Sequence, residues 1–495
     1  MSGTIQFENF PADTWRPHGV FAEIRPNNAN SGQNTQRGLL MAQKLAAGIG
    51  AANVPFLAFS EDQVIENTGA ASMAHLMYRA WRRQDPYGEL WVLPVADDAA
   101  GVAASGTATV AVSSPQAGTI PLYIAGTPVP VGVTTGQTAA QIATAMAAAI
   151  NATANLPVTA AVNGSTAEQV DITARHKGLV QNDVDLRIAY YGVQNGERLP
   201  TGVTVTLVQM ASGVTNPTLT TALSNLPPAP YDYIGFPWTD ATSLTAIKGL
   251  LSEVTGRWSP INMLYGLGFT AYRGNLGAAS SFGNGQNSQF ISCLAFYDSP
   301  TPAWIAAADW AAVHARSLTI NPALPMQEVA LNLLAPPEQN RWDIGERNTL
   351  LYDGISTYYI QDDGTARIDR SITMYQVNAA GSPDDSWLDI ETLAVLMFVA
   401  RYIRSRLSSD FSRRILVENG TRIAGGSLMV TPNTIRAAAL GYYAYLANRG
   451  VVTGIAAFEA GVAAQRVTRG QVRLFLPITV ADQLRQIAVL IGFTK

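Results

Sequence analysis

The chain has 495 residues, more than the roughly 250 to 300 that one hydrophobic core usually serves, so its length indicates two or three domains. Charged residues make up 14% of the sequence against a usual share of about 25%, a composition that suits a surface covered by other subunits. The formal net charge of -4 argues against binding to nucleic acid or to an anionic membrane, because it supplies no global basic field.

The N-terminal residues and the single cysteine bear on the cellular context. Residues 1–11 lack the basic start and apolar stretch of a signal peptide, and no run of about 18 apolar residues predicts a membrane span. Cys293 lies in the apolar run 290–296, which predicts a core position and offers neither a disulfide partner nor metal-site spacing. We therefore expect a protein that is made and folded in a cytoplasm.

Residues 27–95 form the first part of a predicted α/β core. Apolar stretches at residues 39–41, 54–59 and 89–95 predict strands. Asn67 or Thr68 is a suitable N-cap for a helix between them. Apolar side chains recur along that helix at a spacing typical of packing on a core: Met73, Leu76, Met77, Ala80 and Trp81.

Residues 96–226 change in character and predict a β-rich, outward-facing insertion domain. The segment is rich in Ala, Gly, Thr and Val, with strand-like runs at residues 107–112, 120–124 and 203–208. One helix, at residues 138–151, interrupts the strands. Pro227, Pro228 and Pro230 then mark the return to the earlier pattern.

Residues 227–382 continue the core. Residues 231–238, 261–269 and 289–297 predict strands, Asp240 is a good N-cap, and Thr301 with Pro302 starts a further helix. Alternating strands and helices favour a mixed sheet covered by helices, so the expected fold class is α/β (α+β) and multidomain.

Residues 383–470 predict a helical C-terminal domain, and residues 471–495 a strand-like arm. Ser386 is a suitable cap for a helix at residues 387–407, and Thr431 with Pro432 opens another that Gly450 closes. In the arm, Val472, Leu474 and Leu476 alternate with other side chains, Pro477 interrupts, and residues 487–491 are apolar again.

Catalytic patterns are sparse. The four histidines are far apart in sequence, and neither a Walker A loop nor a G-x-S-x-G elbow occurs. A weak G-x-G-x-x-A match at Gly266, Gly268 and Ala271 is followed by the Gly-, Ser- and Asn-rich residues 272–285 in place of the required helix. The acidic pairs at residues 97–98, 362–363 and 384–385 are typical of turns and caps. We predict no enzyme, no catalytic residue, no cofactor and no metal; an α/β nucleotide-binding enzyme is the alternative from another class.

Several segments resemble the tail sheath proteins of Mu-like contractile phages. LAPPEQNR at residues 334–341 and ERNTLLYDGIST at residues 346–357 look like the central signature of that family. Further similar segments occur in the same order: DPYGELWVLP at residues 85–94, WLDIETL at residues 387–393, VTPNTIR at residues 430–436, DQLR at residues 482–485 and LIGF at residues 490–493. The resemblance spans nearly the whole chain and is weakest across the insertion, where such sheaths vary.

The resemblance implies a structural subunit that polymerises in helically stacked, hexameric rings around a tail tube and contracts to drive the tube through the host envelope. It implies as partners other copies of the chain, the tube protein, and baseplate and tail terminator proteins, with no nucleic acid and no direct membrane insertion. The expected location is the virion tail, and the host cytoplasm during assembly. Another phage tail or baseplate structural protein is the alternative within the same class.

The resemblance also implies that both termini add strands to neighbouring subunits. Residues 1–26 form the predicted N-terminal arm, in which the strand-like pieces 4–7 and 19–25 are too isolated to build their own sheet. Pairing of each terminus within its own subunit is the alternative. The predicted inter-subunit contacts are Ile5, Phe7, Val20, Phe21, Val472, Leu474, Leu476, Ile487, Val489 and Ile491.

A cluster of basic residues near the end of the first C-terminal helix is a candidate surface for an acidic tube. Complementation of the helix dipole and ordinary solvation explain such a cluster equally well. Its members are Arg401, Arg404, Arg406, Arg413 and Arg414.

Overall fold

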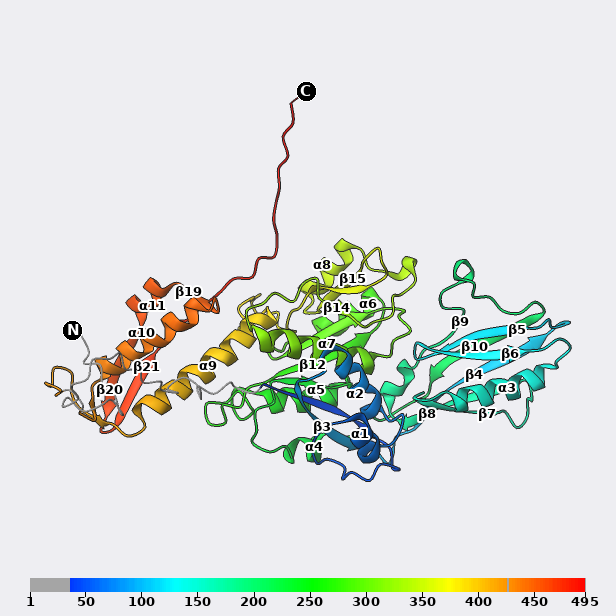
Figure 1. Ribbon diagram of the computed structural model, residues 1–495, viewed down its shortest axis with the longest axis horizontal. Coiled ribbons are helices and arrows are strands. Elements are labelled where there is room, and N and C mark those ends of the chain that lie inside the picture. Colours follow the sequence, from blue (N-terminus) through cyan, green and yellow to red (C-terminus); the bar gives the residue numbers. More distant parts are fainter. Residues whose placement is uncertain (1–35, 425–426, 495) are drawn as a thin grey trace, which may run out of the picture. The chain divides into compact units, whose positions relative to one another are not determined.

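A six-stranded sheet forms the centre of the computed structural model, which describes residues 36–424 and 427–494 (Figure 1). Its strand order is β13-β12-β11-β1-β3-β2, and all pairings are parallel except that of β2 with β3. The strands are β1 (Arg37–Lys44), β2 (Phe56–Leu57), β3 (Glu89–Ala96), β11 (Tyr233–Gly235), β12 (Leu267–Arg273) and β13 (Ile291–Phe296). A mixed sheet whose strands alternate with helices confirms the predicted fold class.

Helices connect and cover these strands. They are α1 (Glu61–Thr68), α2 (Met73–Gln84), α5 (Ala241–Leu251), α6 (Leu276–Asn284) and α7 (Ala303–Ile320). Helices α2 and α7 pack against each other and against β1, and α7 also contacts β11 and β12. Gly38 of β1 allows this close packing, because a Cβ atom there would come within 2.4 Å of the Trp81 ring. The predicted apolar stripe of α2 and the predicted core position of Cys293 are confirmed, since these side chains are buried.

Three predicted element boundaries were wrong, and one helix was missed. Helix α2 begins after Ser72, whose side chain accepts from the amide of His75, whereas Asn67 and Thr68 end α1. Helix α9 (Ile390–Phe411) begins after Asp389 and not after Ser386. Residues 276–284 form α6 despite their Gly and Ser content, because Asn275 caps the first turn. Strand β12 begins at Leu267, since residues 257–262 form turns and bends and residues 263–266 have no regular structure.

A smaller antiparallel sheet joins the main core through the segment that carries the central signature. Its strand order is β14-β16-β15, and helix α8 contacts β15 and α6. Leu350 of α8 is fully buried in the main core. The elements are β14 (Ala330–Leu331), the short helix η3 (Glu338–Asn340), α8 (Ile344–Tyr352), β15 (Thr357–Ile360) and β16 (Ala366–Arg370).

Residues 103–211 form two antiparallel sheets and one long helix. The sheets have the orders β10-β4-β8-β7 and β6-β5-β9, and α3 lies along them (Figure 1). The predicted helix at residues 138–151 is confirmed as α3, and Thr138 caps it through a reciprocal bond pattern with Gln141. The elements are β4 (Ala103–Val112), β5 (Gly118–Ile124), β6 (Thr127–Val133), α3 (Ala139–Ala152), β7 (Val158–Val162), β8 (Gln169–Lys177), η1 (Leu179–Asp183), β9 (Leu186–Ile188), η2 (Val193–Asn195) and β10 (Val203–Ala211). The short helix α4 (Thr220–Ser224) follows this segment.

These sheets enclose a hydrophobic cluster of their own, separate from the main one. Leu219 and Ala222, which follow β10, belong to the main cluster instead. Val102 and Val214 form an antiparallel bridge at the base of the segment. We therefore propose that the insertion domain spans about residues 102–214, within the 96–226 expected from the sequence; the other domain boundaries stay predictions.

The C-terminal region combines two long helices with short strands. Thr431 caps α10 with Pro432 in its first turn, and Gly450 follows the helix with a φ of +70°, as the sequence predicts. The elements are α9, β17 (Ile415–Leu416), β18 (Met429–Val430), α10 (Pro432–Asn448), β19 (Val452–Thr453), α11 (Ile455–Gly461), β20 (Ala463–Thr468), β21 (Gln471–Phe475) and β22 (Thr479–Val480). Over the residues described, no helix combines the length and apolar character needed to cross a bilayer.

Candidate assembly site

Cys293 and His314 are buried titratable groups of the main core. Burial raises the pKa of the Cys293 thiol and lowers the pKa of the His314 imidazole to about 3. The His314 ring nitrogens lie 2.7 Å from the Trp310 carbonyl and 2.6 Å from the Ser371 hydroxyl. In the described ranges, no three His, Cys, Asp or Glu side chains gather where they could hold a metal ion.

The G-x-G-x-x-A match serves strand packing. Gly266 immediately precedes β12, and Gly268 and Ala271 lie inside it. A Cβ atom on Gly266 would approach the Tyr231 carbonyl to 2.4 Å, and its φ of +127° favours glycine. A dinucleotide loop needs its glycines between a strand and the helix that follows. Because these glycines precede and form the strand, they cannot supply such a loop.

Asp97, one of the predicted turn residues, instead joins the insertion domain to the main core. Its carboxylate accepts from Gln43 of β1 at 2.8 Å and lies 2.8 Å from Nδ1 of His176 on β8. Nε2 of His176 in turn accepts from the amide of Met73 at 2.9 Å. These contacts fix the base of the insertion domain to the start of α2.

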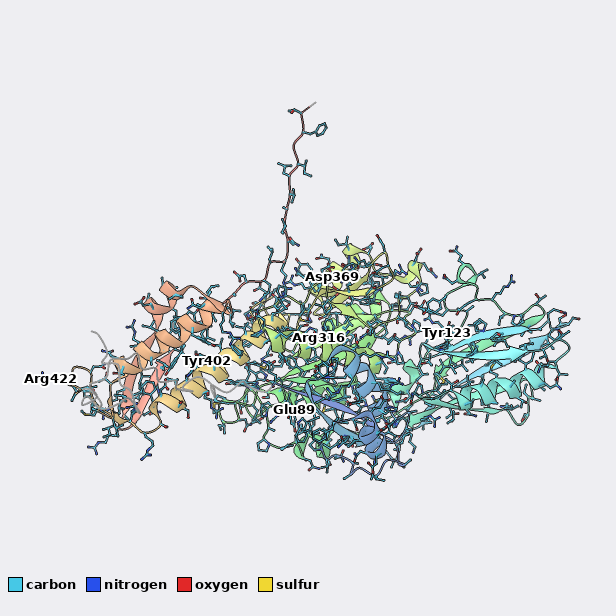
Figure 2. All side chains as sticks on the ribbon, in the orientation of Figure 1. Glu89, Tyr123, Arg316, Asp369, Tyr402 and Arg422 are labelled. Atoms are coloured by element: carbon cyan, nitrogen blue, oxygen red, sulfur yellow. The ribbon has the colours of Figure 1, made fainter. Side chains whose placement is uncertain are left out.

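The C-terminal helices α9, α10 and α11 pack around a small core. The Tyr443 and Phe458 rings stack with centroids 3.7 Å apart, and Tyr402 of α9, labelled in Figure 2, stacks on Tyr445 of α10 at 5.2 Å. Leu474 and Leu476 pack against this core from the chain that follows. The region therefore folds around its own apolar cluster before the terminal segment begins.

Strands β20 and β21 form an antiparallel hairpin with two open edges. Arg466 pairs with Val472 and Ala464 with Leu474, and no third described strand joins the sheet. Val472 and Leu474 are half-buried on one face, while Phe475 is 63% exposed. Two of the predicted inter-subunit residues thus pair within their own chain along one edge. The other edge of each strand presents unpaired backbone groups.

Residues 481–494 carry no helix or strand and are drawn as an extended trace after β22 (Figure 1). Ile487, Val489 and Ile491 are 74%, 75% and 82% exposed. Residues at alternate positions share a face when a segment is extended, so these three form one apolar edge. The predicted N-terminal contacts Ile5, Phe7, Val20 and Phe21 lie outside the described residues.

The five candidate arginines do not lie together on one surface. Arg401 binds the fully buried carboxylate of Asp232, and its own side chain is only 11% exposed. Arg406 lies over the Tyr402 ring at 5.5 Å. Arg404, Arg413 and Arg414 are exposed. Arg401 therefore connects α9 to the main sheet. The prediction of a surface that faces the tube is kept only for the exposed arginines, Arg404, Arg413 and Arg414.

Comparison with known proteins identifies the family. A model of the phage tail sheath protein central domain matches residues 212–374, and a model of the phage tail sheath C-terminal domain matches residues 382–494. The chain is 34% identical over 473 residues to the Mu-like prophage FluMu tail sheath protein of Haemophilus influenzae, covering 95% of each. The chain belongs to the phage tail sheath protein family. Its function is that of a structural subunit of a contractile tail sheath.

Solved sheath structures are similar at low identity. A sheath tail protein from Listeria innocua has a TM-score of 0.48 at 13% identity, covering 92% of this chain and 95% of its own. The helical sheath of the anti-feeding prophage in its contracted state has a TM-score of 0.46 at 12% identity, with coverage of 96% and 98%. Since both TM-scores are below 0.5, the assignment to the sheath family rests on the sequence matches.

Proposed function

We propose that this sheath chain polymerises into hexameric rings stacked helically around a tail tube, with its C-terminal arm inserted into a neighbouring copy. The observation that carries the proposal is the exposed apolar edge of Ile487, Val489 and Ile491, on a segment that pairs with no strand among the residues that the structure describes. An extended segment of this kind gains backbone hydrogen bonds and apolar burial when it adds to an open sheet edge. The β20–β21 hairpin offers such an edge.

Electron microscopy of the purified full chain tests assembly directly. We expect long helical tubes from the unchanged protein and dispersed, folded subunits from the double variant Ile487→Asp with Val489→Asp, because charged side chains oppose burial. Val193→Asp is the matched control, since Val193 is 71% exposed but lies in the insertion domain. Normal tubes from the double variant would remove the arm from the assembly mechanism.

The sheath works as a mechanical component and not as an enzyme in this proposal. Its extended lattice is metastable and passes to a more stable contracted lattice, which drives the tube through the host envelope without nucleotide hydrolysis. The absence of a Walker A loop from the sequence and the family's association with contractile tails support it. A metastable lattice persists because of a kinetic barrier, so the driving free energy is stored during assembly.

Nucleotide-free extended tails test the stored energy. Mild heat or denaturant should shorten them irreversibly, and the contracted form should resist denaturant better than the extended form. A requirement for ATP, or a spontaneous return to the extended length, would contradict the mechanism. Binding to tube, baseplate and terminator proteins, in a virion tail assembled in the host cytoplasm, completes the proposal.

A further inference from the structure

Two of the family-like segments, WLDIETL and DQLR, meet at the N-terminus of α9. Nη2 of Arg485, in the second segment, lies 3.1 Å from Asp389 and 3.0 Å from Glu391, both in the first. The same Asp389 oxygen lies 3.1 Å from Nη2 of Arg370. Two arginines and two carboxylates thus form a charge-balanced cluster, which we name the Arg485 cluster.

Further hydrogen bonds attach this part of the arm to the chain before α9. The Gln327 side chain donates to the Leu484 carbonyl at 2.9 Å and accepts from Nη1 of Arg485 at 3.3 Å. Glu391 also accepts from the amide of Met326 at 2.9 Å through its other oxygen. The arm is therefore attached by backbone and side chain at Leu484 and Arg485.

Burial makes this attachment difficult to break. The Glu391 side chain is 0% exposed, and those of Arg485 and Asp389 are 19% and 22% exposed. Removing Arg485 would leave a fully buried carboxylate without its cationic partner, which costs far more than breaking a surface ion pair. Asp389 and Glu391 also lie at the N-terminus of α9, where the helix dipole attracts negative charge.

Beyond Arg485 the chain changes abruptly. None of residues 486–494 makes a hydrogen bond to another described residue, and Leu490 and Phe493 are 99% and 87% exposed. An extended segment of this length reaches about 30 Å at about 3.3 Å per residue. The boundary between the attached and the free part of the arm therefore lies at one residue.

We infer that the Arg485 cluster anchors the C-terminal arm to its own subunit, so that only the residues after Arg485 pass to a neighbouring copy. This inference rests on the proposed exchange of the arm. The anchor sets the free length of the arm, and it transmits a pull on the arm directly to the N-terminus of α9. Without it, the arm would lengthen by several residues and the coupling between neighbours would weaken.

Trypsin tests the anchor in the full chain before assembly, because it cleaves after arginine. In dilute, dispersed protein we expect cleavage after Arg485 to be slow relative to a free peptide of residues 478–490. Glu391→Gln keeps the size of the side chain but removes its charge, so cleavage after Arg485 should accelerate about tenfold. The readout is the initial loss of residues 486–495 from the intact chain, followed by mass spectrometry.

Glu418→Gln is the matched control, since Glu418 is a carboxylate paired with Arg466 in the same region but is 71% exposed. It should leave cleavage after Arg485 unchanged. If circular dichroism shows that Glu391→Gln does not fold, Asp389→Asn provides the same comparison. Equal cleavage rates for the unchanged protein and the free peptide, or no acceleration in a folded variant, would overturn the anchor. Failure of the unchanged protein to form tubes would overturn the proposed assembly instead.

Discussion

In the insertion domain, α3 and two antiparallel sheets enclose a core, whereas the C-terminal region has a smaller core between its helices, followed by a two-stranded hairpin and an exposed apolar segment. Side chains on β4, β5, β6, β8 and α3 bury one another in the insertion domain. Residues 486–494 bury almost nothing. The contrast is why we propose that the first region is complete within one subunit and that a neighbour completes the second.

Excision of the insertion domain is the most severe test of this contrast. Because Val102 and Val214 are bridged, a short Gly/Ser linker in place of residues 102–214 can join the ends that remain. We expect a folded protein that still forms tubes in electron microscopy. Its melting temperature should fall, since loss of His176 leaves the Met73 amide without its acceptor. Recovery of only unfolded protein would show that the insertion domain is part of the core.

Two core truncations compare the regions directly. Phe458→Ala removes the ring stacked on Tyr443 and should destabilise the C-terminal region by about 3 to 5 kcal/mol, with loss of tubes. Ile172→Ala, at a fully buried position of the insertion domain, should cost about 2 to 5 kcal/mol but leave tube formation intact. Denaturant unfolding and electron microscopy measure both effects. If only the Ile172 variant lost its tubes, assembly would depend on the insertion domain and not on the C-terminal region.

The pH dependence of unfolding shows whether the C-terminal region unfolds together with the main core. Burial raises the pKa of Asp309, on α7, to about 6. Its folded pKa is above the unfolded value of about 3.9, so its contribution to stability is full below about pH 4 and is lost as the pH rises through about 6. The loss is about 3 kcal/mol.

Asp309→Asn should flatten this dependence, because the amide does not titrate. Thermal unfolding between pH 4 and 7, followed separately for the main core and the C-terminal region, is the measurement. Transitions that move together with pH would indicate one cooperative unit. A C-terminal transition that stays constant while the main-core transition moves would indicate a region stabilised independently. An unchanged pH slope in the variant would exclude Asp309 as the cause.

The smallest effect concerns the exposed arginines after α9. Arg413→Glu and Arg414→Glu should each weaken binding to an acidic tube by about 1 kcal/mol or less, and the loss should shrink as salt rises. Tube-free sheath formation should stay unchanged. Arg198→Glu, an exposed position in the insertion domain, is the control for net charge. Binding is measured by co-sedimentation with purified tubes. If all three variants sediment with tubes to the same extent, then solvation and the helix dipole explain the arginine cluster.

Local patterns in the sequence predicted most elements, because they depend on residues a few positions apart. Thr138, Asp240 and Thr431 start helices as expected, since a side-chain oxygen can accept an amide hydrogen three residues on. Alternating Val and Thr residues predicted the strands of the insertion domain, because this pattern also depends only on neighbouring positions. The errors occurred where two local signals compete: Asn67 and Thr68 suit the start of a helix, but they lie at the end of another.

The sequence by itself therefore determined the fold class, the family resemblance and the apolar character of the C-terminal arm. Only the tertiary structure decided that Arg401 turns inward to Asp232, although its neighbour Arg404 is exposed. Likewise, nothing local to DQLR indicates that Arg485 binds Glu391, which is 94 residues earlier. Such pairs depend on where the topology brings distant segments together, and a charged side chain is buried only where hydrogen-bonding groups or an opposite charge compensate it.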